Sequence, residues 1–223
     1  MPIFSDPAQR VAWVNAAPLL LGRPGEAPHT DVQELAELVA LTKPLIDFGS
    51  SAPRRQFLHR SCTEVIGNIA LTNAAHTGLF ARFAASPEAL IHLPLAGLGF
   101  DYRVEGRAWR VKRGCSGLYL PGLPAQVEAG PGSGLLYNLD PALLARHVCF
   151  RASITDAALE RVQRRLQEPL AIDLANPRVA AAWDGLRRLL QRLQPEARQS
   201  TVSNRLHDVI YYASARMLFP DLF

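Results

Sequence analysis

The segment from Gly99 to Ala129 constrains the fold more than any other part of the sequence. Two runs in it alternate apolar and polar residues, 100–104 and 109–112, and the dipeptide Glu105-Gly106 stands between them. Strict alternation is typical of half-buried β-strands, and a glycine in a two-residue connection favours a tight hairpin. Further on, the chain turns a corner at Pro121-Gly122-Leu123-Pro124. The segment therefore predicts a small antiparallel β-barrel rather than a parallel sheet with crossover helices.

Other short runs extend this pattern on both sides. Strand-like runs cover 62–73, 89–95, 117–120, 126–129 and 134–139, and Gly67 suggests a bulge in the first of them. About seven strands at short intervals favour a barrel or sandwich. We find no internal repeat.

Helical periodicity dominates the two ends of the chain. Helix N-caps are predicted at Asp6, Thr30, Asp140, Thr155 and Asn176, and proline follows three of these directly. The expected architecture is α+β, with an N-terminal helical lead over residues 1–58, a central antiparallel β-barrel over 59–139, and a C-terminal helical subdomain over 140–223.

Composition excludes several classes of protein. The 223 residues are 48% hydrophobic and 20% charged, which supports a buried core and argues against a disordered chain. The net charge of +4 comes almost entirely from scattered arginines and does not by itself indicate a nucleic-acid surface. The three cysteines are widely spaced, as in a reducing cytoplasm, and the N-terminus lacks the pattern of a signal peptide. No apolar run approaches the roughly 18–20 residues that a membrane span needs.

No catalytic set is evident in the sequence. Metal-binding barrels commonly use a His-x-His pair on one strand, whereas His92 is flanked by Leu90 and Pro94. The corner at Pro121-Gly122 is not followed by a histidine. The chain has no G-x-S-x-G nucleophile motif and no phosphate-binding glycine loop at the start of a helix. We therefore expect no metal, no cofactor and no enzymatic activity.

Aromatic residues offer a different kind of site. Rings alternate along the predicted strands, and an apolar pocket with a few polar tips could orient a small effector. The candidate pocket residues are His92, Phe100, Tyr102, Trp109, Tyr119 and Tyr137. Tyr119 alternates with Leu118 and Leu120, so the rings cannot all face one cavity. Ordinary packing is the competing interpretation.

The order of these pieces resembles the cupin-like N-terminal domain of AraC-type transcription regulators. The resemblance rests on LIHLPLAGLGFDYRVEGRAWRVKRGCSGLYLPGLP, on YNLDPALLARHV and on the following helix NPRVAAAWDGLRRLLQRL, and it covers roughly residues 60–193. It implies a cupin-like barrel that binds a small-molecule effector, with C-terminal helices that form a homodimer. In that family a pair of helix-turn-helix units then reads DNA. This chain ends at Phe223 without them, so it is either the sensory part of a longer regulator or a natural stand-alone relative.

One apolar helical stripe fits the dimer that the resemblance implies. It consists of Val179, Trp183, Leu186, Leu190 and Leu193. The stripe could equally cover the chain's own barrel, because a helix needs only one apolar partner.

Three functions are thus open. The first is a non-enzymatic sensor whose DNA control depends on a domain absent from this chain. The second is a cupin-like, metal-dependent enzyme with a metal held by His92, His76 and a carboxylate such as Glu64. The third is a stand-alone interaction module whose barrel is filled by its own side chains.

Overall fold

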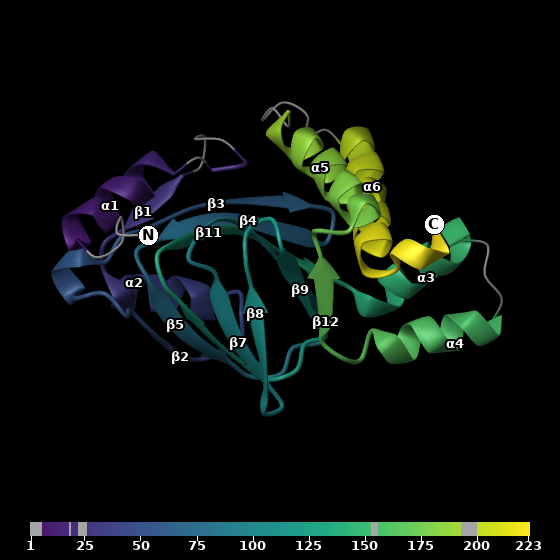
Figure 1. Cartoon of the computed structure of the whole chain (residues 1–223), viewed down its shortest axis with the longest axis horizontal. Coiled ribbons are helices and arrows are strands. Elements are labelled where there is room, and N and C mark those ends of the chain that lie inside the picture. Colours follow the sequence, from purple (N-terminus) through teal and green to yellow (C-terminus); the bar gives the residue numbers. More distant parts are fainter. Residues whose placement is uncertain (1–5, 18, 22–25, 153–155, 193–199) are drawn as a thin grey trace.

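Two antiparallel β-sheets form the centre of the protein, and helices lie on and beside them (Figure 1). The computed structural model describes residues 6–17, 19–21, 26–152, 156–192 and 200–223. One sheet has seven strands in the order β1 (Ala27–His29), β3 (His59–Ile66), β4 (Ile69–His76), β11 (Gly132–Leu139), β6 (Ala89–Gly97), β9 (Ser116–Leu120) and β12 (Leu170–Asp173). The other has five, in the order β2 (Leu45–Gly49), β5 (Leu79–Phe83), β10 (Ala125–Ala129), β7 (Phe100–Val104) and β8 (Arg107–Val111).

The predicted hairpin is confirmed at Glu105-Gly106. These two residues join β7 to β8 with φ angles of 49° and 75°, the positive values that a two-residue hairpin turn requires. The α+β class is also confirmed. Closure into a barrel is not: apart from an isolated bridge between Lys112 and Ser116, the described strands pair within two separate sheets.

The run 62–73, predicted as one bulged strand, is two strands. The chain turns at Gly67-Asn68, and β3 and β4 pair along their whole length as a hairpin, from His59 with His76 to Ile66 with Ile69. A glycine inside an apolar run marked a turn here, because the positive φ of Gly67 reverses the chain. The strand β5 was not predicted.

Helices occupy both ends of the chain, as predicted. They are α1 (Pro7–Ala16), α2 (Val32–Ala40), α3 (Pro141–Ala152), α4 (Asp156–Arg165), α5 (Pro177–Gln191) and α6 (Ser200–Leu218), with short 3-10 turns at Arg54–Gln56 and Pro220–Leu222. Side chains of Asp6, Asp140 and Asn176 accept backbone N–H bonds at the first turns, as expected. The second helix is capped by Asp31 rather than Thr30. The Thr155 cap lies outside the described residues.

The two ends of the chain contribute strands as well as helices. Residues 1–58 contribute β1 and β2, and residues 140–223 contribute β12, each of which pairs at the edge of a sheet. These three strands are edge strands of the two sheets, as is β8.

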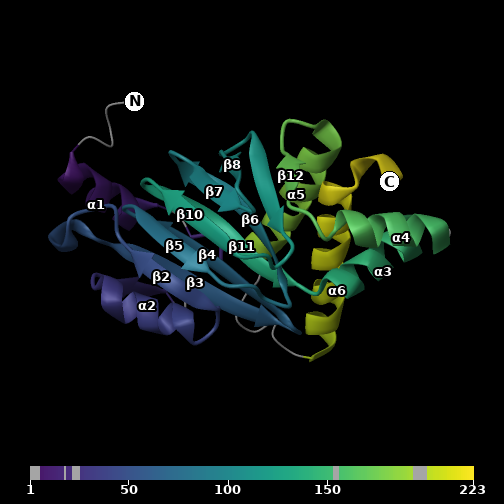
Figure 2. The ribbon, with the colours of Figure 1, turned by 90° about the horizontal axis from the view of Figure 1, so that it is seen from below.

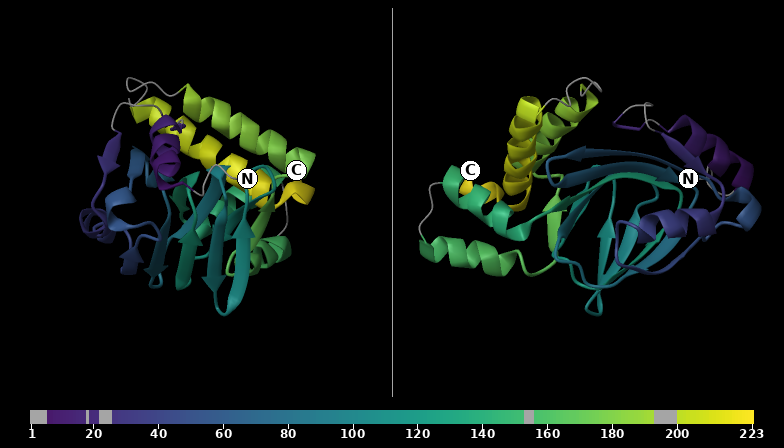
Figure 3. Two further views of the ribbon diagram at one scale, coloured as in Figure 1. Left: turned by 60° about the vertical axis from the view of Figure 1, so that its left-hand side comes forward. Right: turned by 180° about the vertical axis from the view of Figure 1, so that it is seen from behind.

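The seven-stranded sheet has two different faces. Its outer face packs against α3, α5 and α6 and holds the largest apolar cluster, which includes Ile69, Leu71, Ile91, Leu186 and Ile210. The helices α5 and α6 lie side by side over this face (Figure 3). Its inner face looks toward the five-stranded sheet, and we call the space between the two sheets the interior. A smaller cluster with Tyr102, Val104, Leu118 and Val127 fills part of it.

Candidate functional site

Three buried histidines lie along the inner face of the seven-stranded sheet. His59 on β3, His76 on β4 and His92 on β6 are each at most 8% exposed, and we call them the imidazole row. The rings of His59 and His76 are stacked with centroids 6.5 Å apart. Phe100 from the opposite sheet contacts both His76, at 5.5 Å, and His92, at 4.1 Å between centroids. The row therefore runs across three strands of one sheet and faces the other.

The hairpin sets the first half of the row. His59 and His76 are directly paired because they lie at equal distances from the turn. The strand β11 lies between β4 and β6 and has glycines at positions 132 and 134. A Cβ on Gly134 would collide with His92 Nε2, and one on Gly132 would lie 3.2 Å from the Phe100 ring. The absence of side chains at these glycines leaves room for the His92 and Phe100 rings over β11.

The five-stranded sheet completes the site. Phe100 and Tyr102 point inward from β7, and Trp109 pairs directly with Tyr102 from β8. The hydroxyl of Tyr102 and Nδ1 of His92 form a hydrogen bond of 2.7 Å. This bond ties the two sheets together through polar atoms in the interior.

Several polar atoms in the interior have no hydrogen-bond partner among the described residues. They are Nδ1 of His59, both ring nitrogens of His76, Nε2 of His92 and Nε1 of Trp109. Buried polar atoms are almost always hydrogen-bonded, and each orphan costs about 1–3 kcal/mol. Several such atoms together indicate a place where water or a ligand supplies the missing bonds.

Burial keeps the imidazole row uncharged. Loss of hydration lowers the pKa of His59, His76 and His92 to about 3, and for His59 and His76 the neighbouring imidazoles contribute to this lowering. Burial likewise raises the pKa of the Tyr102 hydroxyl. Each imidazole in the row thus offers one N–H donor and one acceptor nitrogen at neutral pH.

The structure divides the six predicted pocket residues into two groups. It brings His92, Phe100, Tyr102 and Trp109 together in the interior. Tyr119 and Tyr137 lie on the outer face instead, where their hydroxyls bond to Leu166 O at 2.9 Å and to Ser214 Oγ at 3.0 Å. They therefore do not share the interior with the other four, because alternate residues of a strand point to opposite faces of the sheet.

The predicted alternative metal set does not assemble. His76 and His92 both face the interior, but Glu64 pairs with Leu71, whose side chain belongs to the outer-face cluster. In the part of the chain that the structure describes, no three His, Cys, Asp or Glu side chains are placed to hold a metal ion.

Sequence reasoning missed His59 as a member of the site. The signal was present: His59 lies eight residues before Gly67, and His76 lies eight residues after Asn68. Interpreting Gly67-Asn68 as a hairpin turn pairs these two histidines directly.

The predicted dimer stripe is buried within the chain itself. Val179, Leu186 and Leu190 are each 1% exposed and pack in the outer-face cluster, with Trp183 partly buried beside them. Their partners include side chains of α6 and of the sheet. This supports the competing interpretation that the stripe covers the chain's own sheet. Leu193 lies outside the described residues.

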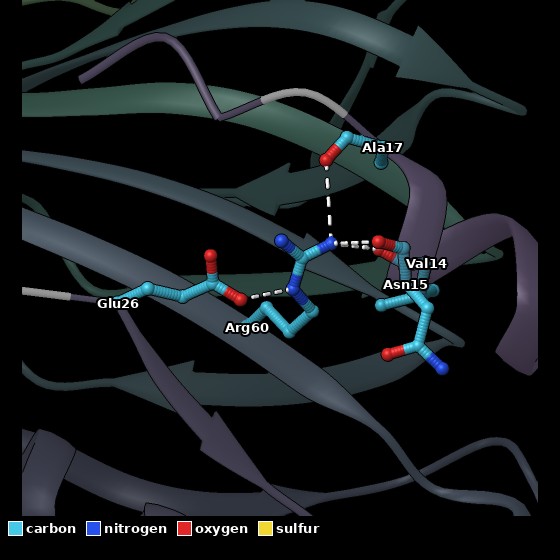
Figure 4. A network of polar contacts seen from close by, with 5 residues as sticks. All are labelled: Val14, Asn15, Ala17, Glu26 and Arg60. Atoms are coloured by element: carbon cyan, nitrogen blue, oxygen red, sulfur yellow. Dashed lines mark hydrogen bonds and ion pairs between the residues drawn. The ribbon is translucent and has the colours of Figure 1, made fainter. Parts of the chain in front are cut away.

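A second buried polar group lies on the outer face, next to the imidazole row in sequence. The guanidinium of Arg60 donates to Glu26 Oε1 and to the carbonyl oxygens of Val14, Asn15 and Ala17, at distances of 2.5–3.3 Å (Figure 4). Arg60 thereby caps the C-terminal end of α1 and fastens that helix to β3. The Arg60 guanidinium thus has hydrogen-bond partners in a carboxylate and in backbone carbonyl oxygens, in contrast to the ring nitrogens of the imidazole row.

Comparison with known proteins addresses the fold. No protein-family model and no curated protein matches the sequence. The structure is similar to that of an AraC-like transcriptional activator. For this activator, CuxR, the TM-score is 0.56 with 15% sequence identity over 82% of this chain and 65% of that chain. The resemblance predicted from the sequence is therefore confirmed at the level of the fold, and this chain spans about two thirds of the activator's length.

Two further solved structures match smaller parts of the chain. A cupin-like protein from Thermotoga maritima has a TM-score of 0.33 and 14% identity over 43% of this chain and 80% of that one. A mutant oxalate decarboxylase from Bacillus subtilis has a TM-score of 0.30 and 15% identity over 55% of this chain and 37% of that one. Similarity at this level carries no functional argument. No described helix is long and apolar enough to cross a membrane.

Proposed function

We propose that this chain is the sensory part of an AraC-type transcription regulator, which binds a small effector in the interior and acts as a homodimer. In this proposal it is not an enzyme, and DNA is read by a helix-turn-helix half outside these 223 residues. The similarity of the fold to an AraC-like activator supports the class of protein. The observation that carries effector binding is the set of unpartnered ring nitrogens in the imidazole row.

The protonation state of these histidines restricts the class of effector that the site can bind. All three are held neutral by burial, so they present hydrogen-bond donors and acceptors but no positive charge. An uncharged molecule that carries hydroxyl or carbonyl groups can satisfy them, and Trp109 and Phe100 supply apolar contact. Burying a charged ligand beside neutral imidazoles would cost far more, because no described counter-charge lines the row.

The sheet itself offers a route from effector to helices. His92 lies on β6 between Ile91 and Leu93, which point to the outer face and pack in the cluster that includes α5 and α6. A ligand that shifts β6 therefore also changes the packing under those helices. Regulation then follows if the effector binds two arrangements of the helices with different affinity.

Thermal shift and native mass spectrometry with a set of uncharged, hydroxyl-bearing metabolites test the site. We expect a ligand that raises the melting temperature of the wild type, whereas His76→Phe and Trp109→Phe lose the shift and keep their fold. Tyr137→Phe, on the outer face of the same sheet, is the matched control and should respond like the wild type. An unchanged response in both interior variants would show that the interior is not the site.

A further inference from the structure

The outer face of the five-stranded sheet carries two rows of side chains in cross-strand register. The first row runs Asp47, Arg82, Gln126, Arg103 and Ala108, and the second runs Gly49, Phe80, Glu128, Asp101 and Arg110. Most of these side chains are exposed, and a groove of about 710 Å³ lies along them. Figure 2, a view from below, shows α2 beside β2, at the edge of this sheet.

The second row contains an unfavourable pair. Glu128 and Asp101 are directly opposite each other on β10 and β7. Like charges at directly opposed positions destabilise a sheet. Arg110 Nε lies 3.6 Å from Asp101 Oδ1, but both side chains of that pair are 56% exposed, so it offsets little. Two carboxylates side by side on an exposed face are better stabilised by a partner that brings positive charge.

We propose that this face binds the same face of a second copy of the chain. A two-fold axis that lies between the two rows and runs across the strands brings the first row of one copy over the second row of the other. Arg103 then faces the partner's Asp101, Gln126 faces the partner's Glu128, and Arg82 faces the partner's Phe80. These contacts are an ion pair, a hydrogen bond and a cation–π contact, and the axis makes each of them twice.

Other arrangements and partners fit this face less well. A two-fold axis along the strands, between β10 and β7, would bring Glu128 against the partner's Asp101 and so add repulsion. A nucleic acid is disfavoured because the two rows hold three arginines and three carboxylates, so a phosphate backbone would meet both signs. The groove gives the long side chains of a facing copy room to enter.

This inference rests on the homodimer of the proposed function and says which surface forms it. The dimer interface is then this face with its exposed polar side chains, and not the apolar stripe of α5, which is buried within the chain. The groove also touches Tyr102 and Trp109 of the interior site. Effector binding is still a separate property, because the imidazole row lies in the interior and the two rows lie outside.

Sedimentation velocity across a range of protein concentrations, with a charge-swap series, tests the surface. Arg103→Asp places two carboxylates across the axis, and Asp101→Arg places two guanidinium groups there. We expect each single variant to raise the dissociation constant of the dimer about ten-fold or more. The double variant R103D/D101R restores opposite charges and should return to within about three-fold of the wild type. Arg161→Asp, on the exposed side of α4, is the control and should leave the dimer unchanged.

A wild type that stays monomeric at about 100 µM would overturn the proposal, since a dimer that functions in a cell needs a lower dissociation constant. So would a dimer that Arg103→Asp leaves intact, or a double variant that remains as weak as the single ones. Thermal shift with the effector set, repeated on the Arg103→Asp monomer, separates this surface from the effector site. Loss of the dimer with retained effector binding supports the surface and leaves the proposed sensor in place. Loss of both, in a variant shown to be folded, would contradict the separation of the two sites.

Discussion

The two faces of the seven-stranded sheet are both buried, but they differ in how far their polar atoms are hydrogen-bonded. On the outer face, the hydroxyls of Tyr119, Tyr137 and Tyr211 are all hydrogen-bonded, and Ser133 Oγ is an exception without a partner among the described residues. On the inner face, four ring nitrogens of the imidazole row have no partner in the described residues. A core built only for stability resembles the outer face. The inner face carries a cost that folding alone does not explain, and this cost is the basis of the proposed effector site.

The first test of this contrast is a charge on the outer face. Leu186→Asp places an unpaired carboxylate in the apolar cluster, where Leu186 is 1% exposed. We expect it to lower the free energy of unfolding by at least about 4 kcal/mol and to give aggregated or unfolded protein. Chemical denaturation, with Ala181→Asp on the exposed side of α5 as control, measures it. A folded, soluble monomer would show that this stripe is an interface between subunits rather than core.

Arg60 tests whether a buried polar group on the outer face is structural. Arg60→Met removes the donors to Glu26 and to the end of α1, and takes the Arg60 guanidinium away from a partly buried carboxylate. We expect a loss of about 3 kcal/mol, with faster protease cleavage near α1. The double variant R60M/E26Q should cost less, because it also removes the negative charge that Arg60 neutralises. Equal costs for both would mean that the contacts to the carbonyl oxygens dominate.

The pH dependence of stability tests the inner face. The pKa of His76 is about 3 in the folded protein and about 6.5 when unfolded, so between these values the unfolded chain binds the proton that the folded chain excludes. Stability therefore falls as the pH drops below about 6.5. One such histidine accounts for about 2 kcal/mol between about pH 7 and pH 5. His76→Phe should reduce the loss by that amount in thermal melts, and an unchanged slope would contradict a buried neutral imidazole.

The sequence foretold the parts of the fold that depend on local periodicity. The β7–β8 hairpin followed from strict alternation and Glu105-Gly106, and three helix starts followed from Asp or Asn before proline. The sheet order did not follow, because the pairing of β11 with β4 and β6 depends on contacts between residues 35 to 66 positions apart.

The candidate site was foretold only in part, for a related reason. His92, Phe100, Tyr102 and Trp109 were identified from alternation along single strands. His59 was missed because the run 62–73 was interpreted as one strand, which hid the register that pairs His59 with His76. Tyr119 and Tyr137 were included because periodicity shows that residues share a face of one strand but not which face of the sheet it becomes.

The smallest expected effect on stability comes from removing the polar group of one side chain on each face. Tyr119→Phe leaves Leu166 O without its buried donor and should cost about 1 kcal/mol. His76→Phe removes two orphaned nitrogens and fills similar volume, so at about pH 7 it should be neutral or slightly stabilising. Denaturant titration of the two variants in the absence of effector measures the difference. A clear loss of stability in His76→Phe would mean that bound water already satisfies the imidazole row, and that the inner face is built for stability like the outer one.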